Sequence, residues 1–199
     1  MKIVRRTLLL CAVAAGLAGT APMPMVAQSF GFGGTAGIVN DVSGDVEFSG
    51  FKWGDANGFF EYRIEKATIF RATYGNMWTQ QSKSESVVTT PDGPVSVPKM
   101  DESVRYGIVS VSYLFWQDYF TSGLFAGIGG YGIRPATVPV DLEPFADPEE
   151  TVFGWHAGVD GEFQVSRQVG VVLRFTYHNV SAHPHRQFVT ADGGAVFRF

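Results

Sequence analysis

The chain has 199 residues, a formal net charge of −4, 45% hydrophobic residues and one cysteine. An acidic, scattered charge excludes a nucleic-acid-binding protein, which needs a concentrated basic surface. No stretch after residue 27 contains the roughly 20 consecutive apolar residues of a membrane-spanning helix, and a single cysteine cannot form a disulfide within the chain.

Residues 1–27 have the pattern of a secretory signal peptide. Lys2, Arg5 and Arg6 precede an uncharged run over residues 7–20, and Ala27 supplies a small residue at the expected cleavage site. Removal of this segment changes the formal charge from −4 to −7, because the segment carries three basic residues and no acidic one. We expect residues 28–199 to form one exported domain.

From residue 28 onward, apolar and polar residues alternate with a period of two, and no helical period stands out, which indicates β-strands. The first strand is predicted at residues 30–40, which leaves 41–53 as a loop; residues 45–53 are the alternative first strand. Seven more strands are predicted at residues 58–64, 68–80, 104–116, 119–134, 152–165, 169–181 and 187–199.

The connections between these strands alternate in length. Short turns are expected near residues 65–66, 117–118 and 166–167, whereas the connections between them are mostly long, at residues 41–53, 81–101 and 136–150. Short turns on one side and long loops on the other are typical of outer-membrane barrels. The sequence therefore predicts an all-β, eight-stranded antiparallel up-and-down transmembrane β-barrel.

The two faces of the strands indicate that the apolar face points outward. A soluble carrier of eight strands would bury its apolar face, yet here the polar face carries charges of both signs: Glu61, Arg63, Arg71, Asp160, Glu162 and Arg174. Aromatic residues gather on the apolar face near strand ends, as in the interfacial girdles of membrane barrels: Trp78, Phe115, Phe120, Phe153, Trp155, Tyr177 and Phe197.

Hairpin arithmetic predicts which lumen residues lie opposite one another. The turn near residue 66 places Glu61 opposite Arg71. The turn near residue 167 gives two more opposed pairs, Asp160 with Arg174 and His156 with His178. We expect ion pairs between the opposed charges, with Arg63, Glu162, His156 and His178 as further polar lumen residues. An eight-stranded interior is just wide enough for side chains, so a closed, salt-bridged lumen is predicted; a narrow channel for small solutes is the alternative.

The segment FFEYRIEKATIFRATYG at residues 59–75 and the closing VFRF resemble the small outer-membrane β-barrel proteins of Gram-negative bacteria, the OmpA/OmpX-like superfamily. The resemblance implies contact with outer-membrane lipids and lipopolysaccharide, a monomer, and a structural or surface-interaction role with an unknown extracellular partner. It also implies that Phe197 and Phe199 form a signal for the barrel-assembly machinery. It implies no shared catalytic residues, no cofactor and no metal.

Two alternative sites compete with this interpretation. His183, His185 and His178 suggest a metal site, but only the first two lie close in sequence, and a metal needs three or four ligands. His178 and Ser181 with Asp160 or Glu162 suggest a lipid-modifying hydrolase. Their spacing of three places His178 and Ser181 on opposite faces of a strand. The acidic loop at 136–150 is expected to be a solvated surface segment rather than a divalent-cation site, and the proline-containing loop at 81–101 is a segment where a partner would be sought.

Overall fold

The structure is a computed structural model, and it describes residues 29–43, 52–65, 67–80, 86–90, 93–97, 101–117, 120–135, 149–183 and 185–199. The predicted signal peptide and the boundary at residue 28 lie outside these residues and stay predictions. The described part of the chain contains no helix with the length and apolar character needed to cross a membrane.

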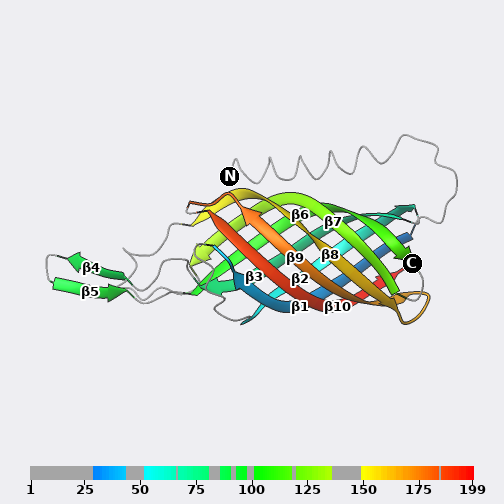
Figure 1. The fold of residues 1–199 in the computed structure, drawn as a ribbon, viewed down its shortest axis with the longest axis horizontal. Helices are drawn as coiled ribbons and strands as arrows, with labels where there is room; N and C mark the ends of the chain where they lie inside the picture. The colour runs from blue at the N-terminus through cyan, green and yellow to red at the C-terminus, as the bar shows by residue number, and fades with distance from the viewer. Residues whose placement is uncertain are drawn as a thin grey trace.

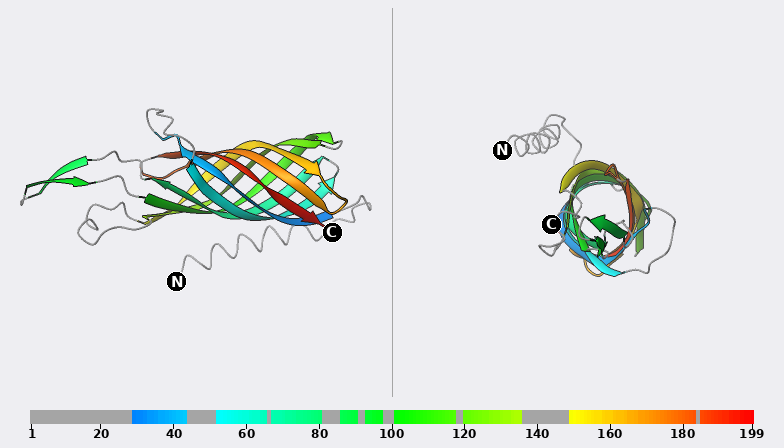
Figure 2. Two further views of the ribbon diagram at one scale, coloured as in Figure 1. Left: turned by 90° about the horizontal axis from the view of Figure 1, so that it is seen from below. Right: turned by 90° about the vertical axis from the view of Figure 1, so that its left-hand side faces the viewer.

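Eight strands form a closed antiparallel barrel (Figure 1), and the view along its axis shows the complete ring (Figure 2). Around the barrel, neighbours in sequence are neighbours in space, and the first strand pairs with the last. The predicted fold class is therefore confirmed. The barrel strands are β1 (Ser29–Asp41), β2 (Lys52–Glu65), β3 (Thr68–Gln80), β6 (Asp101–Gln117), β7 (Phe120–Pro135), β8 (Glu150–Gln164), β9 (Val169–Val180) and β10 (Arg186–Arg198).

The seam between β1 and β10 confirms that residues 30–40, rather than 45–53, contain the first strand. Gly34 lies opposite Ala195, and Phe32 lies opposite Phe197. Backbone hydrogen bonds between Phe30 and Phe199 extend the ladder to the end of the barrel, with N–O distances of 3.3 and 3.0 Å. Closure leaves no unpaired strand edge in the barrel wall, as a lipid environment requires.

The predicted start of β2 is wrong by six residues. The strand begins at Lys52 rather than at residue 58, so the end of the predicted 41–53 loop belongs to the barrel wall. The register against β1 shifts between Gly37, which faces Asp55, and Ile38, which faces Trp53. This bulge turns Trp53 outward and Asp55 into the lumen although both are odd-numbered. A strict period of two therefore does not reach across the bulge.

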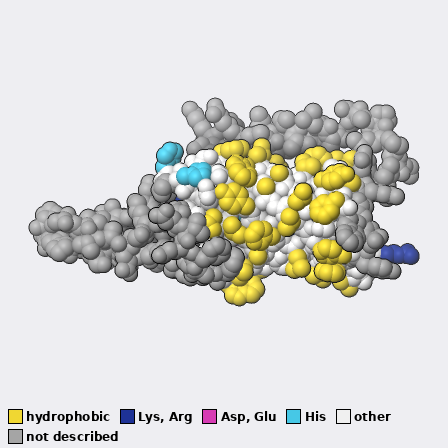
Figure 3. Space-filling view, viewed as in Figure 1, with side chains coloured by type: hydrophobic (Ala, Val, Ile, Leu, Met, Phe, Trp, Pro, Cys, Tyr) yellow, Lys and Arg dark blue, Asp and Glu magenta, His cyan; other side chains and the backbone are white. Residues whose placement is uncertain are grey.

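The outside of the barrel is apolar (Figure 3). Large side chains that face outward include Phe70, Tyr74 and Trp78 on β3 and Val109, Val111, Tyr113 and Phe115 on β6. The predicted direction of both strands is thus confirmed. Near the turns, the rings of Phe30, Phe60, Tyr62, Phe197 and Phe199 form an aromatic patch with Phe32 across β2, β1 and β10.

The connection between β3 and β6 contains a second, two-stranded sheet. Strands β4 (Ser86–Thr90) and β5 (Gly93–Val97) pair antiparallel, from Ser86 opposite Val97 to Thr90 opposite Gly93. This hairpin projects from the loop end of the barrel, away from the end that carries the short turns (Figures 1 and 2). The sequence predicted only a surface loop at residues 81–101, so the hairpin is an addition to that prediction.

Candidate functional site

The lumen at the turn end is held by a network of ion pairs centred on Arg198. Its guanidinium donates two hydrogen bonds to the carboxylate of Glu162, and the one from Nη2 to Oε2 has a length of 2.6 Å. Its Nε also donates to Glu61 Oε1 at 2.7 Å. Arg198 follows from the alternation of β10, where even-numbered residues face inward, but its role as the link between β2 and β8 depends on how the sheet closes.

A second cation, Arg71, continues this network towards the middle of the lumen. Its Nη2 lies 3.1 Å from Glu61 Oε2, and its Nη1 lies 3.0 Å from Asp160 Oδ2. All three side chains are buried. Glu61 and Arg71 face each other in the β2–β3 register, as the arithmetic placed them, whereas Asp160 reaches Arg71 from β8 on another part of the wall.

The expected ion pair between Asp160 and Arg174 is corrected by this geometry. The two residues do lie opposite each other in the β8–β9 register. In the described part of the chain, however, the carboxylate of Asp160 is paired with Arg71, and the guanidinium of Arg174 lies over the ring of Phe125, 4.7 Å from its centroid. Register fixes which backbones are neighbours, but long side chains in a narrow lumen also reach across it.

Two carboxyl groups meet near the centre of the lumen. Asp55 from β2 and Asp192 from β10 lie opposite the same residue of β1, Gly37, and both side chains are buried. Tyr106 donates to Asp55 at 2.9 Å, and Thr190 donates to Asp192 at 3.1 Å. This pair is not predicted from the sequence, because the bulge in β2 shifts the alternation and so reverses the face on which Asp55 is expected.

Both predicted lumen histidines are buried on the β8–β9 hairpin, opposite each other in register. His178 Nδ1 is 3.0 Å from the hydroxyl of Tyr131, and its ring packs against Tyr106. His156 packs against Phe125, and within the described chain its two ring nitrogens have no hydrogen-bond partner. The histidines therefore line the polar middle of the lumen just below an apolar layer.

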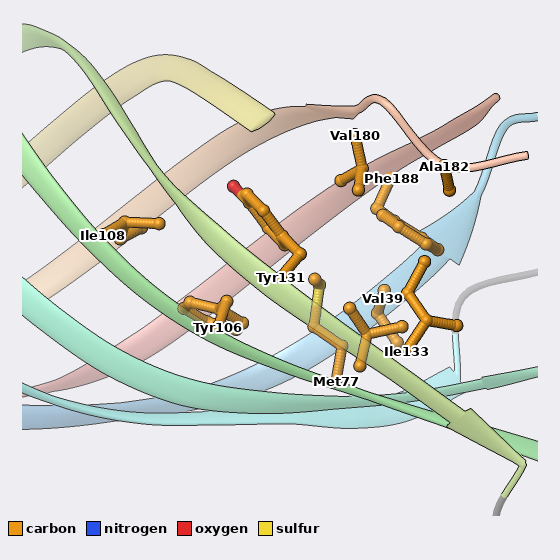
Figure 4. Close-up of a cluster of buried hydrophobic side chains, with 10 residues drawn as sticks. Val39, Met77, Tyr106, Ile108, Tyr131, Ile133, Val180, Ala182 and Phe188 are labelled. Carbon is orange, nitrogen blue, oxygen red and sulfur yellow. The ribbon is translucent and has the colours of Figure 1, made fainter. Parts of the chain in front are cut away.

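An apolar plug fills the lumen towards the loop end (Figure 4). Met77, Val104, Tyr131, Val180 and Phe188 have no exposed surface, and they come from β3, β6, β7, β9 and β10. Further buried members are Val39, Tyr106, Ile108, Ile133 and Ala182. Above the plug, Arg186 binds Glu102 at 2.7 Å and Asp41 at 2.5 Å. The plug separates the polar lumen from the loop end.

The plug is the main part of the lumen that the sequence analysis missed. In β6, Val104, Tyr106 and Ile108 point inward at even positions, whereas Val109, Val111 and Tyr113, further along the strand, point outward at odd positions. The apolar residues thus change from one face of the strand to the other. The first set packs against other side chains in the plug, and the second set lies on the apolar outside of the barrel. This change of face within one strand is the sequence feature that could have indicated the plug.

The alternative sites do not assemble. His178 points into the lumen, and Ser181 is exposed beyond the end of β9, which does not suit a nucleophile and its base. His183 and His185 are exposed at the loop end, away from the buried histidines. In the ranges that the structure describes, no group of three or more His, Cys, Asp or Glu side chains is arranged to hold a metal ion.

The acidic loop is described only at its end. Residues 136–148 lie outside the described ranges, and Glu149 pairs with Arg134 at 2.6 Å on the exposed loop end. The Glu150 carboxylate accepts a hydrogen bond from the backbone N–H of His183 at 3.4 Å. Arg63, the remaining predicted lumen residue, lines a cavity at the turn end together with Glu162.

The sequence matches no protein-family model, and it matches no curated protein. The fold, in contrast, is similar to solved outer-membrane barrels. Neisserial surface protein A has a TM-score of 0.57 at 13% identity, over 86% of this chain and 97% of that chain. The N-terminal β-barrel domain of Pseudomonas aeruginosa OprF has a TM-score of 0.52 at 9% identity, with the same coverage of 86% and 97%. The attachment invasion locus protein Ail of Yersinia pestis has a TM-score of 0.48 at 13% identity, over 86% of this chain and 97% of that chain. At these identities the first two likenesses show a shared fold, that of small outer-membrane β-barrels.

Proposed function

We propose that the protein is an integral outer-membrane barrel with a closed lumen, whose loop end presents the β4–β5 hairpin to an extracellular partner. The membrane setting is supported by the apolar exterior of a closed barrel, which a water-soluble barrel would bury. On this proposal residues 1–27 direct export, the turns face the periplasm, and the loops face the outside of the cell. The similar barrel with the highest TM-score given above is itself named a surface protein.

The projecting hairpin is the observation that carries the interaction role. It has two strands of five residues, and among the described residues each strand pairs only with the other, which leaves their outer edges available to another extended chain. An isolated two-stranded hairpin is at best marginally stable in water. A partner that pairs with an open edge would add backbone hydrogen bonds and order the hairpin, as in strand addition at other sheet edges.

We propose a closed lumen because the plug and the ion pairs fill it. Recording of ionic current through the barrel tests this part of the proposal. The purified barrel, folded in micelles, is inserted into planar lipid bilayers, and current is recorded under an applied voltage. We expect no steady open conductance, because five plug side chains are fully buried across the lumen. A reproducible conductance that persists through many recordings would instead support the alternative of a narrow solute channel.

The hairpin role is tested by replacing residues 86–97 with a flexible glycine–serine segment of equal length. Cells that display the full chain or the replaced chain are compared for adherence to immobilised extracellular-matrix proteins and polysaccharides. Heat-dependent migration on gels confirms that both barrels are folded. We expect cells with the replaced chain to lose adherence. Equal adherence by both chains would contradict a role for the hairpin and indicate another loop. No adherence by either chain would favour a purely structural barrel.

We propose no catalytic role for the barrel. Incubation of the folded barrel with lipid A, followed by mass spectrometry, is expected to show no change in the lipid; a new product would contradict the proposal.

The outward-facing residues Phe197 and Phe199 remain the proposed signal for the barrel-assembly machinery. The surrounding lipids and lipopolysaccharide are the proposed contacts of the apolar exterior. A monomer is proposed, since the barrel is complete within one chain.

A further inference from the structure

The turn end of the barrel contains a cavity that the proposed function does not use. Its volume is about 420 Å³, within the range typical of small-molecule sites. Residues from β1, β2, β7, β8, β10 and the β8–β9 turn contribute to its lining, so it spans the mouth of the barrel. The polar lining includes three arginines and two glutamines: Arg63, Arg167, Arg198, Gln164 and Gln168.

The carboxylates near this cavity are already engaged. Both oxygens of Glu162 contact Arg198, and the two oxygens of Glu61 contact Arg198 and Arg71. These two glutamates attract Arg63 electrostatically, but Arg198 and Arg71 repel it. Each carboxylate therefore has a closer cation than Arg63.

The two other arginines of the cavity lining are Arg63 and Arg167. Among the residues that the structure describes, neither forms an ion pair or a side-chain hydrogen bond. Arg63 is half-buried, and its Nε is fully buried without an acceptor. A guanidinium removed from water without a counter-ion is unfavourable. The cavity thus combines two arginines that form no ion pair within the described chain, half-buried Arg63 and exposed Arg167, with the unsatisfied buried Nε of Arg63.

The chemistry that satisfies this lining is an oxyanion with several acceptor atoms. Each guanidinium presents a planar fork of N–H donors, which matches two oxygens of one phosphate group. The side-chain amides of Gln164 and Gln168 and the hydroxyl of Thr121 add neutral donors around the same space. Tetrahedral phosphate oxygens can meet donors from several sides, whereas a planar carboxylate offers two oxygens in one plane.

We propose that the turn-end cavity binds a phosphate group, with Arg63 and Arg167 as its principal ligands. Two sources present this chemistry: a phospholipid headgroup and a soluble phosphate ester. Phe199 connects the cavity with the lipid-facing surface, since it lines the cavity and its ring also packs beside Phe30 and Phe32 on the outside. Aromatic side chains of this kind sit at the headgroup level of a bilayer.

Arginine-selective NMR of the folded full barrel tests the proposal. The barrel is placed in nanodiscs of phosphatidylcholine, and the Nε resonance of Arg63 is followed while glycerol phosphate is added. In a second arm, phosphatidylglycerol replaces part of the phosphatidylcholine without any soluble phosphate. We expect a saturable shift of the Arg63 resonance in at least one arm. A shift in the first arm only identifies a soluble ester, and a shift in the second arm only identifies the anionic lipid headgroup.

Variants separate the site from general attraction to the barrel; in the Arg63 variants, binding is followed at the Nε resonance of Arg167 instead. Arg63→Gln is expected to weaken binding about tenfold to a hundredfold, the effect of losing one or more charge-assisted hydrogen bonds, and Arg167→Gln is expected to weaken it similarly. Arg134→Gln, at the opposite end of the barrel, serves as the matched control and should bind as the unaltered chain does. Arg63→Lys retains the charge but loses the fork, which keeps the test available if Arg63→Gln does not fold. Equal binding by all variants, or no saturable shift in either arm, would overturn the proposal.

Discussion

Replacing Arg71 with methionine tests whether the ion pairs in the lumen determine the stability of this barrel. Arg71 is 4% exposed and bridges the carboxylates of Glu61 and Asp160 at 3.1 and 3.0 Å. Methionine keeps much of the side-chain volume but leaves two buried carboxylates without this cation. Two charge-assisted hydrogen bonds at about 1.5–3 kcal/mol each suggest a loss of about 3–6 kcal/mol, and breaking a buried ion pair by removing one partner costs about 3–5 kcal/mol.

The measurement is a urea titration of the barrel folded in lipid vesicles, followed by tryptophan fluorescence and by heat-dependent migration on gels. We expect Arg71→Met to lower the free energy of unfolding by about 3–5 kcal/mol. The matched control is Arg134→Met, which removes an ion pair that is shorter still, at 2.6 Å, but whose side chains are 47% and 56% exposed. Because exposed pairs contribute about 0–1 kcal/mol, this variant should unfold almost as the unaltered chain does.

A second substitution separates the orphaned charge from lost packing. In the Arg71→Met background, Glu61→Gln removes one of the two carboxylates that the first change leaves without this partner. We expect the double variant to be more stable than Arg71→Met alone, although Arg198 also contacts Glu61 and makes the recovery incomplete. A loss below about 1 kcal/mol for Arg71→Met would refute the reasoning, since that is the range of a surface pair.

Three further predictions follow from contacts in the barrel wall and lumen. Gly194→Ala places a Cβ 1.9 Å from a backbone oxygen of β1, so it should lower the free energy of unfolding by about 1–3 kcal/mol or more, or prevent closure. Lipid-facing Gly193→Ala, whose nearest contact is 3.6 Å away, should change that free energy by less than about 0.5 kcal/mol. Gel migration after folding compares the two variants. Tyr131→Phe removes the hydroxyl 3.0 Å from His178 and should cost about 1–3 kcal/mol in urea titrations, and no measurable loss would show that the bond contributes nothing. Phe199→Ala should reduce the amount of folded barrel in outer-membrane fractions, because it removes the ring that packs on β1; unchanged insertion would contradict the assembly role.

The sequence by itself determined the strands and their direction. Alternation with a period of two identifies a strand and also states which residues share a face, since successive side chains point to opposite sides. The predicted residues 68–80 coincide with β3, and Phe70 and Trp78 face outward as expected. Short hairpin turns also fix local register, which is why Glu61 opposite Arg71 and His156 opposite His178 could be worked out.

Only the tertiary structure decided which side chains meet across the lumen. Asp160 contacts Arg71 instead of the Arg174 that faces it in register, because closure brings β8 and β3 to the same interior. The apolar plug depends on the same closure, since its members come from strands far apart in sequence. The bulge opposite Gly37 changed the phase of β2 and so the direction of Asp55. A periodic pattern describes one strand and its hairpin neighbour, whereas contacts across the lumen depend on the diameter and stagger of the whole barrel.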